Sequence, residues 1–205
     1  MTESTSESEL LAAARKPTTA WLESLFGEGA VWRPAESELP ERLTDAGARA
    51  FLTTVGLPAA RLSFAGWDSA DLPEEGMWEE DPDELFGNRY PDDDSEPERY
   101  AYSIGTRNGQ HLMLCGESGG LDVYDPDGWD HAEGYGGHAA GSLASMVGAL
   151  GLLARFENRL TGDGAESDAA RAEFTALLTE LGHDPESAFW EPLLTDLADE
   201  YGTLD

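Results

Sequence analysis

The chain has 205 residues, 40% of them hydrophobic and 26% charged, and its 42 Asp and Glu against 12 Lys and Arg give a formal net charge of −30. Binding to nucleic acid requires basic side chains that neutralise phosphates, so this composition argues against a DNA or RNA reader. The length suits one domain with a sizeable core, for which 6 Trp, 6 Tyr and 7 Phe supply anchors.

Nothing in the sequence indicates export or a membrane span. The first nine residues are polar and acidic, whereas a secretory signal starts with a basic region followed by an apolar one. The longest apolar run, 143–154, is shorter than the roughly 20 residues that a bilayer requires. Cys115 is the only cysteine, which excludes an intramolecular disulfide and a cysteine zinc cluster. A cytoplasmic protein that does not contact membranes is expected.

The N-terminal part predicts a flexible segment followed by short helices. Residues 1–17 are rich in Ser, Thr and Glu around a short Leu10-Leu-Ala-Ala-Ala14 patch that ends at Pro17. They are expected to be a flexible polar N-terminus that frays or forms one or two helical turns, with a single domain over 18–205. Thr18 or Thr19 can cap a short helix that ends at Phe26. A second helix is predicted from Thr44 as N-cap to Val55, because its apolar residues recur every three or four positions. Residues 61–65 could form the first strand.

Residues 66–98 form an acidic excursion. Between residues 71 and 99 there are 13 Asp and Glu against two Arg, interspersed with Pro and without a sustained helical or strand period. The segment also contains aromatic and aliphatic side chains, which a purely solvated tail would lack. A long loop with apolar anchors is predicted.

The region after the excursion has the pattern of β-structure. Alternating residues predict strands over 100–104, 110–115 and 121–124. Asn108-Gly109 between the first two is a strong hairpin signal. Sequential strands with short turns predict an antiparallel meander that leaves one face for helices.

Three helices are predicted after the strands. Ser142 can cap a helix of about 18 residues, and two more follow near 167–181 and 187–201, within a C-terminal helical segment over 163–205. The order of helices, strands and helices predicts an α+β fold, with the antiparallel meander packed by helices on one face.

Two motifs match the residue pattern of an enzyme signature but lack the secondary structure that the signature requires. Gly116-Glu-Ser-Gly-Gly120 fits G-x-S-x-G, but a nucleophile elbow leads into a helix, whereas this turn leads into another predicted strand. Residues 134–139 fit a loose dinucleotide pattern, but no strand follows the next helix to carry the acidic residue. A hairpin turn at 116–120 and a flexible Gly/Ala connection over 132–141 are the favoured interpretations.

A group of acids and histidines invites a metal site, which the spacing does not favour. The residues are Asp125, Asp127, Asp130, His131, Glu133 and His138. As a calcium loop, the fifth and twelfth positions would be Trp129 and Gly136, neither of which supplies a side-chain oxygen. A turn followed by an exposed loop is favoured, and no catalytic, cofactor-binding or metal-binding residue is predicted.

The acidic excursion carries the one specific functional prediction. Its carboxylates would steer the encounter with a basic protein, and its aromatic side chains would hold the complex, although a merely solvated loop is the alternative. Such a segment can act as a decoy for nucleic acid. The predicted partner-binding residues are Trp78, Glu79, Glu80, Asp81, Asp83, Glu84, Phe86, Tyr90, Asp92, Asp93 and Asp94.

Several short pieces resemble the SUKH superfamily, particularly its fourth subgroup, found in actinobacteria. These pieces are 50–58 with Phe64, 102–105, 112–114, 121–124 and 142–147, together with Asp184-Pro185, Phe189-Trp190 and the last helix ending at Tyr201. The resemblance covers about residues 40–205. The sequence departs from it in a longer acidic insertion before Tyr100 and in the Gly-rich stretch 134–141.

The resemblance implies an α+β immunity protein that binds and neutralises a bacterial polymorphic toxin, many of which are nucleases or nucleic-acid deaminases. The implied partner is a cognate toxin domain of basic character. The family has no catalytic residues, so the resemblance assigns none to this chain. Two other functions remain open. One is a non-catalytic regulatory module with a housekeeping partner, and the other is a hydrolase or metal-dependent enzyme centred on Ser118 or on 125–133.

Overall fold

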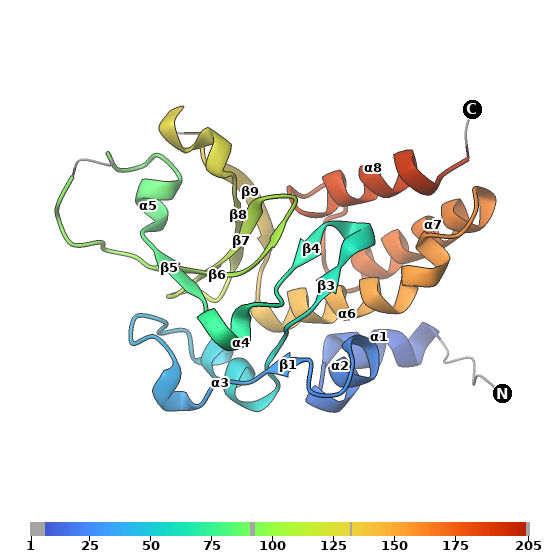
Figure 1. The fold of residues 1–205 in the computed structure, drawn as a ribbon, viewed down its shortest axis with the longest axis horizontal. Helices are drawn as coiled ribbons and strands as arrows, with labels where there is room; N and C mark the ends of the chain where they lie inside the picture. Colours follow the sequence, from blue (N-terminus) through green and yellow to red (C-terminus); the bar gives the residue numbers. More distant parts are fainter. Residues whose placement is uncertain (1–6, 91–92, 132, 204–205) are drawn as a thin grey trace.

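The computed structural model describes residues 7–90, 93–131 and 133–203, and the chain forms helices on one side of an antiparallel sheet (Figure 1). The N-terminal elements are α1 (Glu7–Arg15), α2 (Thr19–Phe26), β1 (Val31–Trp32), η1 (Glu36–Glu38), α3 (Ala46–Thr54), β2 (Leu57–Pro58), β3 (Arg61–Leu62) and η2 (Ser63–Ala65). Then follow β4 (Trp67–Asp68), α4 (Leu72–Glu75), β5 (Trp78–Glu80), α5 (Pro82–Leu85), β6 (Ala101–Arg107), β7 (Gln110–Cys115) and β8 (Leu121–Tyr124). The last elements are η3 (Pro126–His131), β9 (Tyr135–Ala140), α6 (Leu143–Leu160), α7 (Ala165–Glu180) and α8 (Trp190–Tyr201).

The predicted meander is confirmed and is longer than expected. In the described residues the main sheet has the order β3-β4-β6-β7-β8-β9, with antiparallel pairs throughout. Asn108 and Gly109 have φ angles of 49° and 88° and close the β6–β7 hairpin, as the Asn-Gly signal predicts. The flexible connection expected over 132–141 was wrong for its described part, because 135–140 form β9 on the edge beside β8.

Two short strands share one edge of β6. Strand β4 pairs with Thr106 and Arg107, and β5 pairs with 101–103. The register of β6 against β7 shifts between Ser103 and Thr106, and Gly105 lies there with a φ of 149°. A Cβ at Gly105 would lie 2.6 Å from the Trp67 ring, so the close approach of Trp67 requires glycine.

The acidic excursion is more structured than the long loop predicted for it. It contains β4, α4, β5 and α5 in its first half, and β5 extends the sheet. Asp81 starts α5 by accepting a hydrogen bond from the Asp83 N–H at 2.8 Å. The sequence pattern missed these elements because each is only two to four residues long, too short to show a period.

One face of the sheet joins the helices in the main core. Tyr102, Ile104, Leu112, Leu114 and Val123 point to this face and belong to one buried cluster with the apolar residues of α6, α7 and α8. Ser142 is confirmed as the N-cap of α6, since its hydroxyl accepts a hydrogen bond from the Ser145 N–H at 3.3 Å. The predicted α+β architecture is therefore confirmed, with the long helices on one face of the meander and the short helix α5 on the other.

The N-cap of α3 differs from the prediction. Asp45, rather than Thr44, accepts the hydrogen bond of the Ala48 N–H, at 2.6 Å. The Thr44 N–H instead donates to the carbonyl of Gly116 at 2.7 Å, which ties the start of α3 to the β7–β8 turn. Similarly, the strand predicted over 61–65 ends after Leu62 and gives way to η2.

Residues 7–15 form a helix, the helical alternative of the prediction for 1–17, and it is packed rather than frayed. Leu11 and Ala14 of α1 are buried against α6, where Gly148 allows a close approach. A Cβ at Gly148 would lie 2.0 Å from the backbone oxygen of Ala14. The tertiary contact with α6 therefore stabilises a helix that would be too short to be stable by itself. Residues 1–6 lie outside the described residues.

Replacing Gly148 by alanine is expected to displace α1. Because the added methyl meets backbone, α1 must shift, and the free energy of unfolding should fall by about 1–3 kcal/mol. Hydrogen exchange should show faster exchange of the α1 amides. Gly141→Ala is the matched control, since no atom lies within 4 Å of a Cβ there. Unchanged α1 protection in G148A would contradict this packing.

Candidate partner-binding surface

The second face of the sheet carries the excursion. Strand alternation places His111 and Met113 of β7 and Asp122 and Tyr124 of β8 on this face, opposite the main core. Helix α5 lies over it, and Leu85 packs with Met113 and Tyr124 in a small cluster that is separate from the main core. The face is thus only partly covered, by a segment rich in carboxylates.

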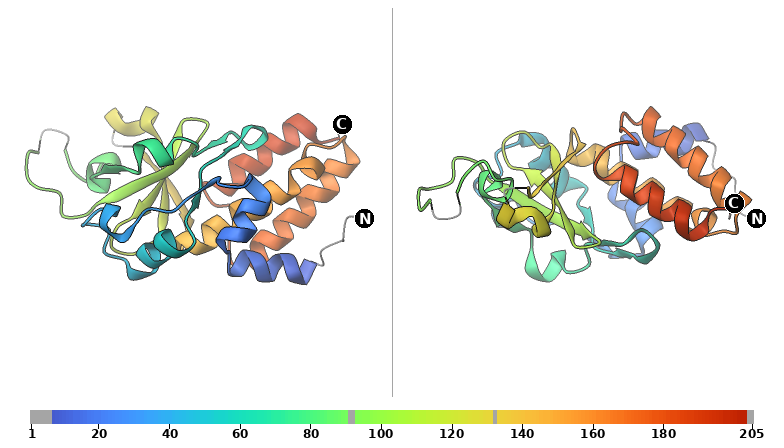
Figure 2. Two further views of the ribbon diagram at one scale, coloured as in Figure 1. Left: turned by 60° about the horizontal axis from the view of Figure 1, so that its bottom comes forward. Right: turned by 90° about the horizontal axis from the view of Figure 1, so that it is seen from above.

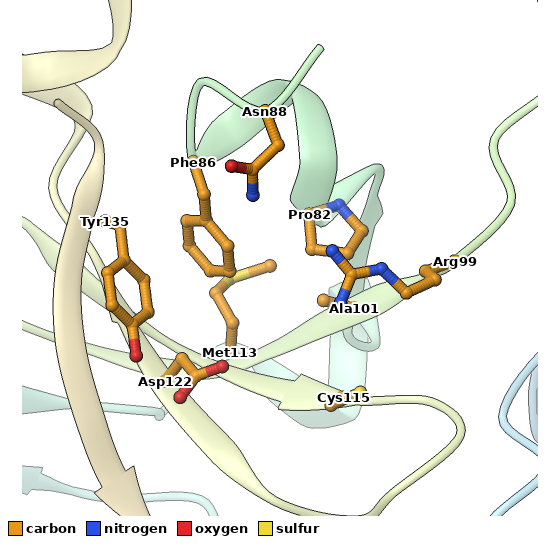
Figure 3. Close-up of a pocket in the computed structure, with 9 residues that line it drawn as sticks. All are labelled: Pro82, Phe86, Asn88, Arg99, Ala101, Met113, Cys115, Asp122 and Tyr135. Atoms are coloured by element: carbon orange, nitrogen blue, oxygen red, sulfur yellow. The ribbon is translucent and has the colours of Figure 1, made fainter. Parts of the chain in front are cut away.

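A pocket of about 370 Å³ opens between α5 and the sheet (Figure 3). Phe86 and Tyr135 form one wall, with ring centroids 5.0 Å apart, and the Met113 side chain lies at the floor. Arg99 and Asp122 supply charges at its rim, and each already has a partner within the chain. The pocket is therefore mainly a concave, partly apolar feature of a larger surface.

Two of the predicted partner-binding carboxylates are used inside the protein. Asp81 is 5% exposed and accepts a hydrogen bond from Arg89 at 2.6 Å. Asp83 is half-buried and forms an ion pair with Arg99, whose guanidinium lowers the pKa of that carboxyl. Asp81 and Asp83 therefore carry no free charge, because each neutralises an arginine, Arg89 within the excursion and Arg99 directly after it. That they contact a partner stays a prediction.

Arg89 also organises the chain that follows α5. Besides Asp81, its guanidinium donates to the carbonyl oxygens of Asp93 and Ser95. The Ser95 N–H donates to the Asp93 carboxylate at 3.0 Å and lowers its pKa. This chain projects at the end of the molecule opposite the C-terminal helices (Figure 2). Its described part is consequently held in one shape rather than left as a solvated tail.

The predicted aromatic anchors occupy different environments. Tyr90 is 80% exposed and Trp78 is 42% exposed, which are unusual values for large side chains. Phe86 is half-buried against Tyr135 and lines the pocket. Trp78 and Tyr90 are thus available for contact, and Phe86 mainly shapes the surface.

The remaining predicted acids do not share one face. In the register of β5 with β6, Glu79 lies opposite Tyr102, whereas Glu80 lies opposite Ala101. Glu79 therefore faces the helical side, where it helps burial to raise the pKa of Tyr102. Glu80 lies on the second face, where burial and then the nearby Glu84 carboxylate raise its pKa. Asp93 and Asp94 are exposed, and Asp92 lies outside the described residues.

The structure adds residues that the sequence interpretation did not select. His111 and Tyr124 lie beside Trp78 on the second face, and Tyr135 is 50% exposed at the pocket. The signal was present in the alternation of 110–115 and 121–124, where polar or aromatic residues alternate with aliphatic ones. Which face they belong to follows only from the strand pairing.

The G-x-S-x-G stretch and the residues that follow Asp125 make hydrogen bonds within turns of the chain. Gly116 to Gly120 form the β7–β8 turn, with Gly119 at a φ of 69° and the Ser118 hydroxyl accepting from the Gly120 N–H. This agrees with the predicted hairpin turn. Asp125 likewise accepts hydrogen bonds from Gln110 and from the Asp127 N–H, both at 3.0 Å. Within the described residues, no group of three or more His, Cys, Asp or Glu is arranged to hold a metal ion.

A serine-histidine pair that the sequence did not suggest also has a structural role. The Ser145 hydroxyl lies 2.9 Å from His183 Nε2. The Trp190 indole N–H donates to His183 Nδ1, so the ring proton is assigned to Nε2, which donates to the Ser145 carbonyl oxygen at 3.1 Å. In this tautomer His183 cannot accept the serine proton, which a nucleophilic serine would require.

Comparison with known proteins identifies the family. The model of the SUKH-4 immunity protein family matches residues 17–196, a range that extends from the start of α2 into α8 and contains the whole acidic excursion. No curated protein and no solved structure matches the chain. Among the described residues, no helix is long and apolar enough to cross a membrane. The chain belongs to the SUKH-4 immunity protein family.

Proposed function

We propose that this immunity protein neutralises a toxin that acts on nucleic acid, a nuclease or a nucleic-acid deaminase, by covering the toxin's basic substrate-binding cleft. The observation that carries the proposal is an acidic, aromatic-bearing surface, with Trp78 exposed on the second face and Tyr90 exposed in the chain after α5, among the carboxylates of the excursion. A toxin that binds a phosphate backbone needs a basic surface, and an acidic protein can occupy that surface in place of the nucleic acid.

The mechanism requires binding without chemistry. The net charge of −30 attracts a basic domain at long range and accelerates the encounter. Exposed aromatic side chains then hold the complex after water is displaced. Arg89 and Arg99 keep the acidic chain in place before the toxin arrives, so less conformational entropy is lost on binding. Binding in the cytoplasm of the producing cell would protect its own nucleic acids.

Capture of the partner tests the proposal directly. The purified protein is immobilised, exposed to lysate of its source, and washed at low and then high salt, and the eluted proteins are identified by mass spectrometry. The proposal expects a basic toxin domain released by salt, which the immunity protein then inhibits in a nuclease or deaminase assay. A housekeeping partner instead, or a captured toxin without nucleic-acid activity, would overturn it.

Association with the captured toxin should depend strongly on salt. Because opposite charges steer the encounter, the association rate constant is expected to fall about tenfold or more between 25 and 500 mM NaCl, while the dissociation rate constant changes less. Stopped-flow fluorescence of the tryptophans measures both. Arg99→Gln removes one positive charge beside the excursion and frees the Asp83 carboxylate, so it should raise the association rate, while any loss of pre-organisation should raise the dissociation rate. An association rate independent of salt would exclude electrostatic steering.

A further inference from the structure

Three aromatic rings meet on the second face beside β5. The Trp78 ring centroid lies 4.9 Å from that of His111 and 6.2 Å from that of Tyr124, and the latter two are 5.9 Å apart. Trp78 remains 42% exposed although it stacks on this group. Burial lowers the pKa of His111, so the ring is neutral at pH 7. The cluster therefore presents an uncharged aromatic wall to solvent.

Carboxylates border this wall without any basic partner. In the described part of the chain, Glu80 and Glu84 form no ion pair. They repel each other, and partial burial makes the charge of Glu80 still less favourable, so its pKa is raised. Asp81 and Asp83, in the same segment, each have an arginine. The chain thus neutralises the inward acids and leaves Glu80 and Glu84 uncompensated.

Tyr124 contributes its ring to the aromatic wall and leaves its hydroxyl open to solvent. Tyr124 is 5% exposed, yet its hydroxyl makes no hydrogen bond to any described residue. Burial raises its pKa, and so do the nearby carboxylates of Glu80, Asp125 and Glu84. The hydroxyl is not among the buried polar atoms that lack a partner, so it reaches solvent, where a donor from outside can bond to it.

We propose that Trp78, His111 and Tyr124 form an aromatic wall and Glu80 and Glu84 an acidic rim that together bind an arginine side chain of the toxin. This inference rests on the proposed function and specifies the contact that the toxin makes. A guanidinium stacks on an indole and donates paired hydrogen bonds to carboxylates, whereas an ammonium is a compact, strongly hydrated charge. An arginine would relieve the repulsion between the two glutamates, and one of its N–H groups would donate to the Tyr124 hydroxyl oxygen.

A small probe tests the site without the toxin. Acetyl-arginine-methylamide is titrated into the ¹⁵N-labelled protein, and the Trp78 indole N–H signal, assigned with Trp78→Phe, is followed by NMR. The proposal expects a saturable shift of this signal, weaker with acetyl-lysine-methylamide and absent with the uncharged citrulline analogue. An equal response to arginine and citrulline, or no response to arginine, would overturn the proposal.

Neighbouring glutamates supply a matched control. Glu80→Gln with Glu84→Gln should weaken the arginine response at least tenfold, because the rim loses both charges. Glu79→Gln removes the same charge one residue away but from the opposite face of β5, so its response should equal that of the wild type. Equal losses in E79Q and E80Q would show only general electrostatic attraction and would contradict a defined site.

The toxin itself separates this inference from the proposed function. If the captured toxin binds E80Q/E84Q and Trp78→Ala as tightly as the wild type, the arginine site is wrong while neutralisation stands. If the arginine probe binds at Trp78 but the captured partner is not a nucleic-acid toxin, the proposed function fails and the site remains. The expected result is a loss of toxin affinity of at least 30-fold in each variant, with E79Q within about threefold of wild type.

Discussion

Replacing Trp190 by alanine is expected to lower the free energy of unfolding by about 3–5 kcal/mol, the largest loss expected from a single change in this protein. Trp190 is fully buried at the start of α8, where its ring contacts Phe174 and Phe189 at centroid distances of 5.9 and 4.8 Å. Truncation leaves a cavity between α7 and α8 that the packed helices cannot fill. Urea denaturation followed by circular dichroism measures the loss, and a loss below 1 kcal/mol would contradict this packing.

Trp190→Phe tests the polar part of the same site. It retains most of the volume but removes the indole N–H that donates to His183 Nδ1. In the wild type, burial lowers the pKa of His183 below its ordinary value, so the unfolded chain takes up a proton first as pH falls. Stability therefore declines from about pH 6.5 down to the folded-state pKa.

With the indole N–H gone, Nδ1 can accept a proton more readily, and the pKa of His183 should rise toward its ordinary value. The decline in stability between pH 7.5 and 5 should then be smaller in W190F than in wild type. Since carboxylate titration is common to both proteins, the difference between the two pH profiles reports His183. Identical profiles would show that the indole does not set its protonation.

Replacing Arg89 by leucine should produce the second large effect. Asp81 and Arg89 have side chains that are only 5% and 14% exposed, so the change leaves a buried carboxylate without its partner. Breaking such a pair costs about 3 kcal/mol or more. The loss should be concentrated in α5 and the chain after it, which hydrogen exchange of 82–90 and 93–99 would show.

Two further variants check the cause of this loss. Adding Asp81→Asn to R89L removes the buried charge and should recover at least half of the lost stability. Arg61→Leu is the matched control, because its pair with Asp68 is largely exposed and should be worth less than about 1 kcal/mol. Equal losses in R89L and R61L would indicate that burial of the Asp81 pair does not matter.

The strands and helices that the sequence predicts correctly depend on local physics. Asn108-Gly109 adopts the positive φ angles that a two-residue hairpin requires, whatever the rest of the chain does. The helix after Ser142 follows from a serine cap and apolar residues at helical spacing. By contrast, β9 contains Gly136 and Gly137 and has little intrinsic strand preference. It forms because β8 offers an unpaired edge.

The candidate surface was predicted as a region but not in its details. The sequence indicates a negative, aromatic-bearing segment at 66–98, and its α5 lies at one end of the molecule, whereas its β4 lies near the middle (Figure 1). It did not indicate that Asp81 and Asp83 point inward. Their partners follow 8 and 16 residues later, and no periodic pattern relates residues at such separations. His111 and Tyr124 were missed because they come from other strands.

The sequence by itself determined the α+β class, the meander, the helix after Ser142, the negative charge and, through family resemblance, the immunity role. Turn chemistry, capping and periodicity act over a few residues, so these features can be recognised locally. Only the tertiary structure decided which carboxylates face outward. The pairing of β5 with β6 sends Glu79 to one face and Glu80 to the other, and the arginines neutralise two of the acids. Surface charge is thus distributed by long-range contacts, which composition does not contain.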